Sequence, residues 1–309
     1  MKPDILVAYP PEEGFGPGVG SYAVVYVRPE TNTVLYERAI VAGIRARGDA
    51  IIYTANLNGR LFESDGILKR HYVTQLAFAA DPLGQLKLYP EIGERLARHF
   101  GQPADRLPLV GAFQAATRTP AEELFETFVP PEDFLACWGQ QFKRIGGEVV
   151  ANPGLPAVLR RYTPQANVFV VVVRSPDGSP GFFAALNRAI YLEITSRAET
   201  PLVDGERLGG APWSERVRRT YHLSRTHLMA MFDMADLVYL GEGRRLPLAD
   251  TPLGRSLRAD GILSDELFHD LPSEPLRRMQ GGSHRTLHYL PLAGEGQDLD
   301  WARDFLRRL

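Results

Sequence analysis

The six apolar residues from 168 to 173, Val-Phe-Val-Val-Val-Val, constrain the fold more than any other segment of the chain. A run that is apolar at every position is typical of a strand covered on both faces, at the centre of a sheet with helices around it. The run is far shorter than the roughly 18 to 20 residues of a membrane helix. We therefore expect a central strand here, in a sheet that is partly parallel.

The N-terminal third predicts mainly strands. Segments 5–9, 22–28, 34–40 and 50–55 are rich in Val, Ile, Tyr and Ala, and the first three of these residue types favour extended backbone or pack well on a sheet. Turn-forming residues, Pro-Glu-Thr-Asn-Thr, occupy positions 29–33. Segments 22–28 and 34–40 are therefore expected to form an antiparallel hairpin.

Helical patterns begin in the middle of the chain. Apolar residues recur at helical spacing over residues 64–80. The segment Thr119-Pro120-Ala121-Glu122 has the form of a capping box with proline at the first helical position, which predicts a helix start. A second helix is expected after Pro131, on apolar residues at helical spacing: Phe134, Trp138, Phe142 and Ile145. A strand over 148–150 and a short helix over 155–162 are expected to follow.

The C-terminal half is less regular. Residues 182–194 fit both a helical and a strand pattern, and a long amphipathic helix is expected over 213–236. Prolines interrupt the segment 241–282, which predicts irregular structure with short helices, as in a lid or an interface loop. A strand over 287–292 and a terminal helix over 299–309 complete the expected elements.

The expected fold class is α+β or α/β. It has a mixed sheet with an antiparallel N-terminal hairpin region and a more parallel central part, flanked by helices. The length fits one large domain or two ordinary ones. We expect a single domain over residues 1–309, with a division into a β-rich part, 1–115, and an α/β part, 116–309, as the alternative.

Composition and charge limit the cellular compartments and the classes of binding partner that we expect for this chain. The net charge of −2 gives no global basic field for a nucleic acid or an anionic membrane. Cys137 is the only cysteine, so an intrachain disulfide is impossible, and its place beside an apolar stripe predicts a buried core thiol. The N-terminus lacks the pattern of a signal peptide. We expect a cytoplasmic protein whose partner is a small anionic molecule, and the sequence identifies no cofactor.

The first candidate site is the glycine-rich segment 14–21, which follows the first expected strand. Alternating glycines allow successive backbone N–H groups to converge on an anion, and a serine hydroxyl can add a further donor. The residues with this predicted role are Gly16, Gly18, Gly20 and Ser21. Neither the dinucleotide fingerprint nor the P-loop pattern is present, so a flexible hairpin entry or gating loop is the competing interpretation.

Two histidines four residues apart, His284 and His288, form the second candidate. Either a helix or a strand presents this spacing on one face, where two imidazoles could bind one metal ion. An arginine replaces the glutamate of the helical zinc-protease motif, so that motif is excluded. A third ligand would come from elsewhere, and the candidates are His222, His227, His269 and Asp233.

The third candidate is the polar face of the expected helix 213–236, which carries Arg218, His222, Arg225 and Asp233. Arginines bind carboxylate or phosphate, and a histidine transfers protons near neutral pH. The alternative interpretation is a solvated helix face with ordinary i to i+4 ion pairs.

These candidates lead to one principal hypothesis and one from another class. The principal hypothesis is a hydrolase or transferase that acts on a small anionic or phosphorylated substrate, with His222 or His284 as the catalytic group and with Arg218, Arg225 and the glycine-rich segment binding the anion. The alternative is a noncatalytic binding or assembly protein, in which the segment after 241 and the C-terminal helix form the interface of a homo-oligomer.

A third hypothesis is a metal-dependent nuclease. A strand, a glycine-rich link, a hairpin and a helix resemble the start of a ribonuclease H-like fold. That chemistry needs clustered carboxylates, whereas the body of the first strand has none, and Asp4, Glu12 and Glu13 flank it.

Overall fold

The computed structural model describes residues 4–9, 15, 20–175, 181–196, 220–240, 243–262, 264, 276–278, 284–286, 300, 303 and 306–307. The chain divides into two compact units. The first unit contains residues 1–67, 162–204 and 212–309, and the second contains residues 68–161 with 205–211. Each unit has its own sheet, with helices packed around it, so the α+β class is confirmed. The number of folding domains stays a prediction.

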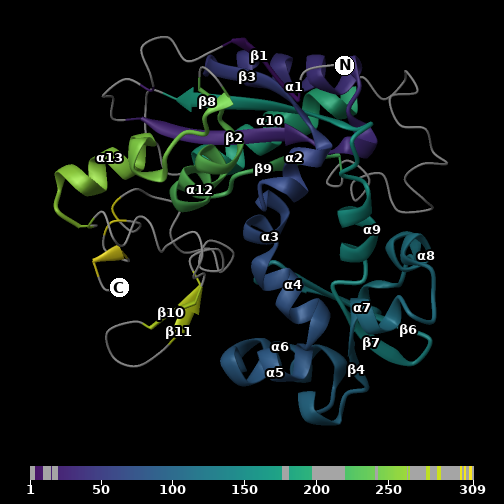
Figure 1. Cartoon of the computed structure of the whole chain (residues 1–309). Coiled ribbons are helices and arrows are strands. Elements are labelled where there is room, and N and C mark those ends of the chain that lie inside the picture. The colour runs from purple at the N-terminus through teal and green to yellow at the C-terminus, as the bar shows by residue number, and fades with distance from the viewer. Residues whose placement is uncertain are drawn as a thin grey trace. The chain divides into compact units, whose positions relative to one another are not determined.

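The sheet of the first unit has five strands in antiparallel order (Figure 1). In spatial order they are β1 (Ile5–Tyr9), β3 (Ala50–Asn58), β8 (Asn167–Ser175), β2 (Ser21–Val27) and β9 (Tyr221–Leu223). The central position of β8 confirms the expectation from the apolar run. The expected parallel pairing is wrong for β8, which pairs antiparallel with both β2 and β3. Burial of both faces makes a strand apolar in either direction, so the apolar run does not indicate how the strand pairs.

Two helices cover one face of this sheet. The helix α1 (Val34–Ala46) connects β2 to β3, and α10 (Phe182–Ser196) connects β8 to β9. Their apolar side chains share one core with inward-facing residues of β2, β8 and β9. Each helix joins two strands that have a third strand between them. This interleaving is the split βαβ, or ferredoxin-like, topology, with the second unit inserted between β3 and β8.

The expected hairpin over 22–28 and 34–40 is therefore wrong. Residues 34–40 belong to α1, whose buried residues follow a helical repeat: Tyr36, Ala39, Ile40, Gly43 and Ile44. Val, Tyr and Ile favoured a strand by composition, but the i, i+3, i+4, i+7 spacing decides the structure because it places one helical stripe on the sheet. The resemblance to a ribonuclease H-like start depended on this hairpin and loses its basis.

The second unit contains a mixed sheet in the order β4 (Leu109–Gly111), β7 (Glu148–Ala151), β6 (Gln140–Ile145) and β5 (Phe134–Cys137). Its parallel pair is β4 with β7, and the other pairs are antiparallel. Its helices are α4 (Val73–Ala80), α5 (Pro82–Leu88), α6 (Pro90–Phe100), α7 (Ala112–Ala115), α8 (Ala121–Glu126) and α9 (Leu155–Arg160). The short helices α2 (Gly59–Ser64) and α3 (Ile67–His71) follow β3.

The helix expected after Pro131 is wrong, because this segment forms the hairpin β5–β6. Trp138 and Gly139 connect the strands with φ angles of 47° and 78°. Two successive residues with positive φ match the right-handed twist of a two-residue hairpin, and they cannot continue a helix. The apolar spacing alone fits a helix, but the two turn residues exclude one.

Residues 182–194, which fitted both a helical and a strand pattern, are helical. The short helix expected over 155–162 is confirmed as α9. A helix does follow Thr119, but α8 starts after Pro120 and has no side-chain cap. Glu122, the expected capping partner, instead lies 2.7 Å from the guanidinium of Arg161.

The C-terminal part of the first unit departs from the expected long helix over 213–236. Residues 221–223 form β9, and the helix that follows is α12 (His227–Leu237), with α13 (Pro252–Ala259) after it. The strands β10 (Leu276–Arg278) and β11 (His284–Thr286) pair antiparallel. The strand expected at 287–292 lies outside the described residues. No helix among the described residues is long and apolar enough to cross a membrane.

Cys137 provides a prediction about thiol reactivity. Burial raises the pKa of its thiol to about 11, and the positive charge of Arg95 opposes this only partly. Because the thiolate is the reactive form, we expect Cys137 in the folded chain at pH 8 to react with iodoacetamide about a hundredfold more slowly than an ordinary thiol. The rate should rise with pH up to about 11.

The single cysteine makes this assay specific, and mass spectrometry follows the modification. The same chain unfolded in urea is the control and should react at the ordinary rate. The structure places Cys137 at intermediate burial in β5 and not in the core. Equal rates for the folded and unfolded chain at pH 8 would contradict the prediction that this partly buried thiol is unreactive.

Candidate active site

The strongest candidate site lies where β9 leads into α12, within the first unit. Strand β9 extends the sheet beside β2, with Tyr26 opposite His222. Tyr221 and Leu223 point into the core that contains α1 and α10. Because side chains alternate along a strand, His222 lies on the opposite face of the sheet.

Helix α12 brings a buried carboxylate to this face. The hydroxyl of Thr226 caps the helix by accepting a hydrogen bond of 3.2 Å from the N–H of Met229. The helix then packs against β2. Asp233, which lies in the second turn of the helix, has 5% of its side chain exposed.

His222 and Asp233 are in direct contact. His222 Nε2 lies 2.8 Å from Asp233 Oδ2, and 11% of the histidine side chain is exposed. Since an ionised carboxylate can only accept, this contact places a proton on Nε2. The neutral imidazole then carries its lone pair on Nδ1, the nitrogen that can take up a second proton.

Two neighbours hold this pair in place. The hydroxyl of Ser224 donates to the same Asp233 oxygen at 2.8 Å and accepts from the backbone N–H of Val24 at 3.0 Å. The ring of Tyr26 stacks on the imidazole, with centroids 4.7 Å apart and planes at 19°. The carboxylate fixes the histidine tautomer, and the tyrosine fixes the plane of the ring.

This geometry gives His222 the properties of a general acid or base. When Nδ1 accepts a proton, the ring becomes cationic and the buried carboxylate of Asp233 stabilises that charge. Ser224 is fully buried and bonds to Asp233 rather than to the imidazole. The arrangement therefore supports Ser224 as a positioning residue and not as a nucleophile.

The structure brings His222 and Asp233 together for a different reason from the one the sequence suggested. On one continuous helix, residues 11 positions apart would be separated by about 16 Å along the axis. The change from β9 to α12 folds them against each other. Arg225 lies in the link between the two elements and is exposed, whereas Arg218 lies outside the described residues.

The glycine-rich segment is described only in part. Gly16 and Gly18 lie outside the described residues, and the Phe15 side chain is buried. A Cβ on Gly20 would lie 2.8 Å from the carbonyl oxygen of Ser175, so close approach of β2 to β8 requires glycine there. Ser21 is fully buried, and its hydroxyl has no hydrogen-bond partner among the described residues.

The predicted metal pair His284 and His288 is not tested. The backbone of His284 belongs to β11, but its side chain and the whole of His288 lie outside the described residues. The predicted role of these two residues stays a prediction.

Sequence reasoning missed Tyr26 and Ser224. The cross-strand register that pairs Tyr26 with His222 cannot be read from residues nearly 200 positions apart. A local signal did exist for the helix boundary, because threonine is a frequent N-cap and Thr226 lies two residues before the apolar run that starts at Leu228. Placing the start of α12 after Thr226 would have separated His222 from Asp233 into two elements.

Comparisons with protein-family models, curated proteins and solved structures found no match to this chain.

Proposed function

We propose that the chain is an enzyme, a hydrolase or transferase, that uses His222 as its general acid or base on a small anionic substrate. The contact between His222 Nε2 and Asp233 Oδ2, at 2.8 Å within a nearly buried pair, is the observation that supports this proposal most directly. A buried carboxylate that fixes the tautomer of an imidazole is a recurring arrangement in acyl and phosphoryl transfer.

Proton transfer in this proposal uses the two ring nitrogens differently. Nε2 keeps its proton in the hydrogen bond to Asp233, and Nδ1 removes a proton from the attacking hydroxyl or water. The same nitrogen then returns the proton to the leaving group. Asp233 compensates the positive charge of the ring between these steps, and Ser224 keeps the carboxylate oriented.

An anionic substrate is favoured by the position of Arg225 at the end of β9. Its exposed guanidinium is three residues from His222 in the chain and can form paired hydrogen bonds to carboxylate or phosphate oxygens. Arg225 would act mainly in binding, so its replacement by glutamine is expected to raise KM more than it lowers kcat.

The test is turnover of two anionic esters, p-nitrophenyl phosphate and bis(p-nitrophenyl) phosphate, by the wild-type chain and its variants. We expect His222→Gln to lower kcat at least about a hundredfold, the usual contribution of general acid-base catalysis. His99→Gln, on α6 in the second unit, is the matched control and should retain the wild-type rate. Equal rates for wild type and His222→Gln, or no turnover of either ester, would contradict the proposal.

A metal ion is the second candidate role for the same pair. Imidazole nitrogen and carboxylate oxygen are both common ligands of divalent metals, and these two atoms lie close together. Elemental analysis of protein purified without chelator distinguishes the two roles. A stoichiometric metal that disappears in both His222→Gln and Asp233→Asn would identify metal ligands, whereas a metal-free active chain would leave His222 as the proton-transfer group.

A further inference from the structure

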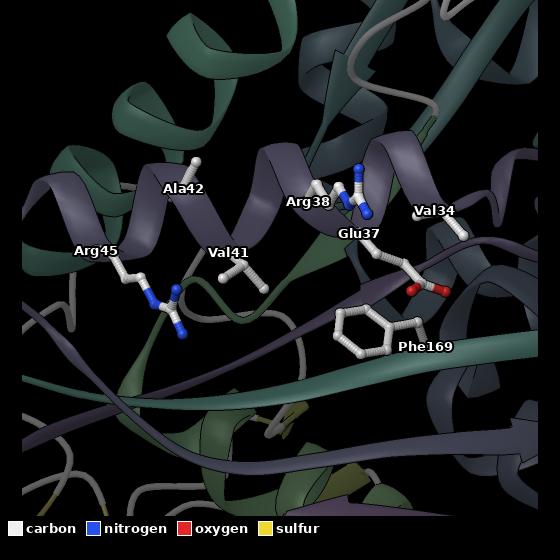
Figure 2. Close-up of a pocket in the computed structure, with 7 residues that line it drawn as sticks. All are labelled: Val34, Glu37, Arg38, Val41, Ala42, Arg45 and Phe169. Atoms are coloured by element: carbon white, nitrogen blue, oxygen red, sulfur yellow. The ribbon is translucent and has the colours of Figure 1, made fainter.

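A second feature of the first unit has the properties of a ligand site. The outer side of α1 and the sheet below it form a hollow that is open to solvent and has a volume of about 440 Å³. We call it the α1 pocket, and Figure 2 shows the residues that line it: Val34, Glu37, Arg38, Val41, Ala42, Arg45 and Phe169. A volume of several hundred cubic ångströms suits a small organic molecule.

The floor of the α1 pocket is apolar, and apolar residues also form part of its walls. Phe169 of β8 forms the floor, and Figure 2 shows Val41 pointing from the helix toward the strand that carries it. Val34 is 58% exposed although it is an aliphatic residue. Strand register places Leu6 and Asn56 on the same face of the sheet as Phe169, and Leu6 is 55% exposed. The polar Asn56 therefore separates Phe169 from Leu6 on this face.

Two arginines flank this apolar surface. Arg38 and Arg45 are seven residues apart on one face of α1, which separates their Cα atoms by about 10 Å along the axis. Neither forms an ion pair within the described part of the chain. A negatively charged group at the level of Val41 would lie about 5 Å along the axis from each of them.

Glu37 is the acidic residue that lines the α1 pocket, and it opposes the two arginines. Figure 2 shows its carboxylate beside Phe169. Burial raises the pKa of this carboxyl, because a charged group is poorly solvated there. With two arginines and one glutamate, the lining keeps a net charge of 2 − 1 = +1.

We propose that the α1 pocket binds an amphiphilic organic anion, a molecule with an apolar body and a sulfonate, carboxylate or phosphate group. The apolar body covers Val41 and Phe169, and the anionic group lies between Arg38 and Arg45. The combination of an apolar floor with two guanidinium groups that form no ion pair within the described part of the chain distinguishes this surface from an ordinary solvated helix face.

This site is separate from the proposed active site. Phe169 belongs to the core beneath α1 and α10, together with Tyr221 and Leu223. His222, between those two residues, faces the other side of the sheet. The ligand of the α1 pocket therefore cannot reach His222, and this inference does not depend on the enzymatic proposal.

Isothermal titration calorimetry on the full chain tests the site with three probes, with decanesulfonate kept below its micellar concentration. Decanesulfonate has both an apolar body and an anionic group, whereas decanol lacks the charge and methanesulfonate lacks the apolar body. We expect decanesulfonate to bind one per chain with a Kd below about 1 mM, and the other two probes to bind at least about tenfold more weakly.

Variants with opposite expected effects identify the surface. Arg38→Gln and Arg45→Gln should each weaken decanesulfonate binding about fivefold, the effect of losing one partly exposed charge interaction. Glu37→Gln should strengthen binding by about the same factor, because it removes the opposing charge. Arg188→Gln is the matched control, an exposed arginine of the neighbouring helix α10, and should leave the Kd unchanged.

Four results would overturn the inference. Decanesulfonate that does not bind below about 1 mM excludes the site, and decanol that binds equally well reduces it to an apolar patch. A Kd that stays constant in Arg38→Gln, Arg45→Gln and Glu37→Gln places the binding elsewhere. A Kd that changes in Arg188→Gln as much as in the pocket variants indicates nonspecific attraction of anions.

Discussion

Replacing Asp233 with alanine should lower the free energy of unfolding of the first unit by about 3–5 kcal/mol. The substitution removes one carboxylate oxygen that accepts from both His222 and Ser224. Both partners are nearly or fully buried, so each loses a hydrogen bond that water cannot easily replace. The small cavity left by the carboxylate adds to the loss.

Urea unfolding followed by circular dichroism measures this difference, and two variants make it specific. Asp236→Ala lies on the same helix, but its carboxylate is 3.9 Å from the partly exposed Arg245. We expect that control to lower the free energy of unfolding by less than about 1 kcal/mol. Asp233→Asn keeps one acceptor oxygen, so its loss of stability should lie between those of the two alanine variants. A loss for Asp233→Ala no larger than that for Asp236→Ala would show that the pair does not stabilise the fold.

The central strand was the element most predictable from sequence, and the reason is physical. Residues 168–173 are apolar at every position because both faces of β8 are buried, and the β-branched valines of this short run favour a strand over a buried helix. Strand direction was not predictable. It depends on the crossovers through α1 and α10, which join strands that are not neighbours in the sheet.

Two errors in predicting secondary structure had the same physical origin. Residue types favour a strand over 34–40, although the apolar spacing there is helical. Apolar spacing favours a helix over 134–145, although Gly139 has a positive φ angle that forms a turn. In both segments two local signals disagreed. Tertiary burial decided the first segment, because a helical stripe faces the sheet, and backbone geometry decided the second.

The candidate site was predictable only in its residue types. His222 and Asp233 were both recognisable as groups that transfer protons or bind metals. Their contact depends on the register between β9 and β2 and on the cap at Thr226, which together reverse the chain over a few residues. Ser224 and Tyr26 act through that same geometry, so no spacing in the sequence could identify them.

Gly43 provides the second large expected effect on stability. A Cβ at this position would lie 2.8 Å from the Cα of Ile190, so the backbones of α1 and α10 approach more closely than any side chain allows. Gly43→Ala should destabilise the first unit by about 2 kcal/mol, because the clash exceeds the gain of about 1 kcal/mol in helix propensity. Thermal unfolding measures the change.

Gly93→Ala in α6 is the matched substitution, since the nearest atom to its Cβ would be 3.8 Å away. It should stabilise the second unit by up to about 1 kcal/mol, whereas Gly43→Ala destabilises the first unit. Stabilisation by Gly43→Ala would contradict the close packing of α1 on α10.

Because α1 can relieve the clash only by moving away from α10, Gly43→Ala should also displace Val41 and Arg45 and weaken decanesulfonate binding in the α1 pocket. The stability of the helix layer and the shape of that pocket therefore depend on the same glycine.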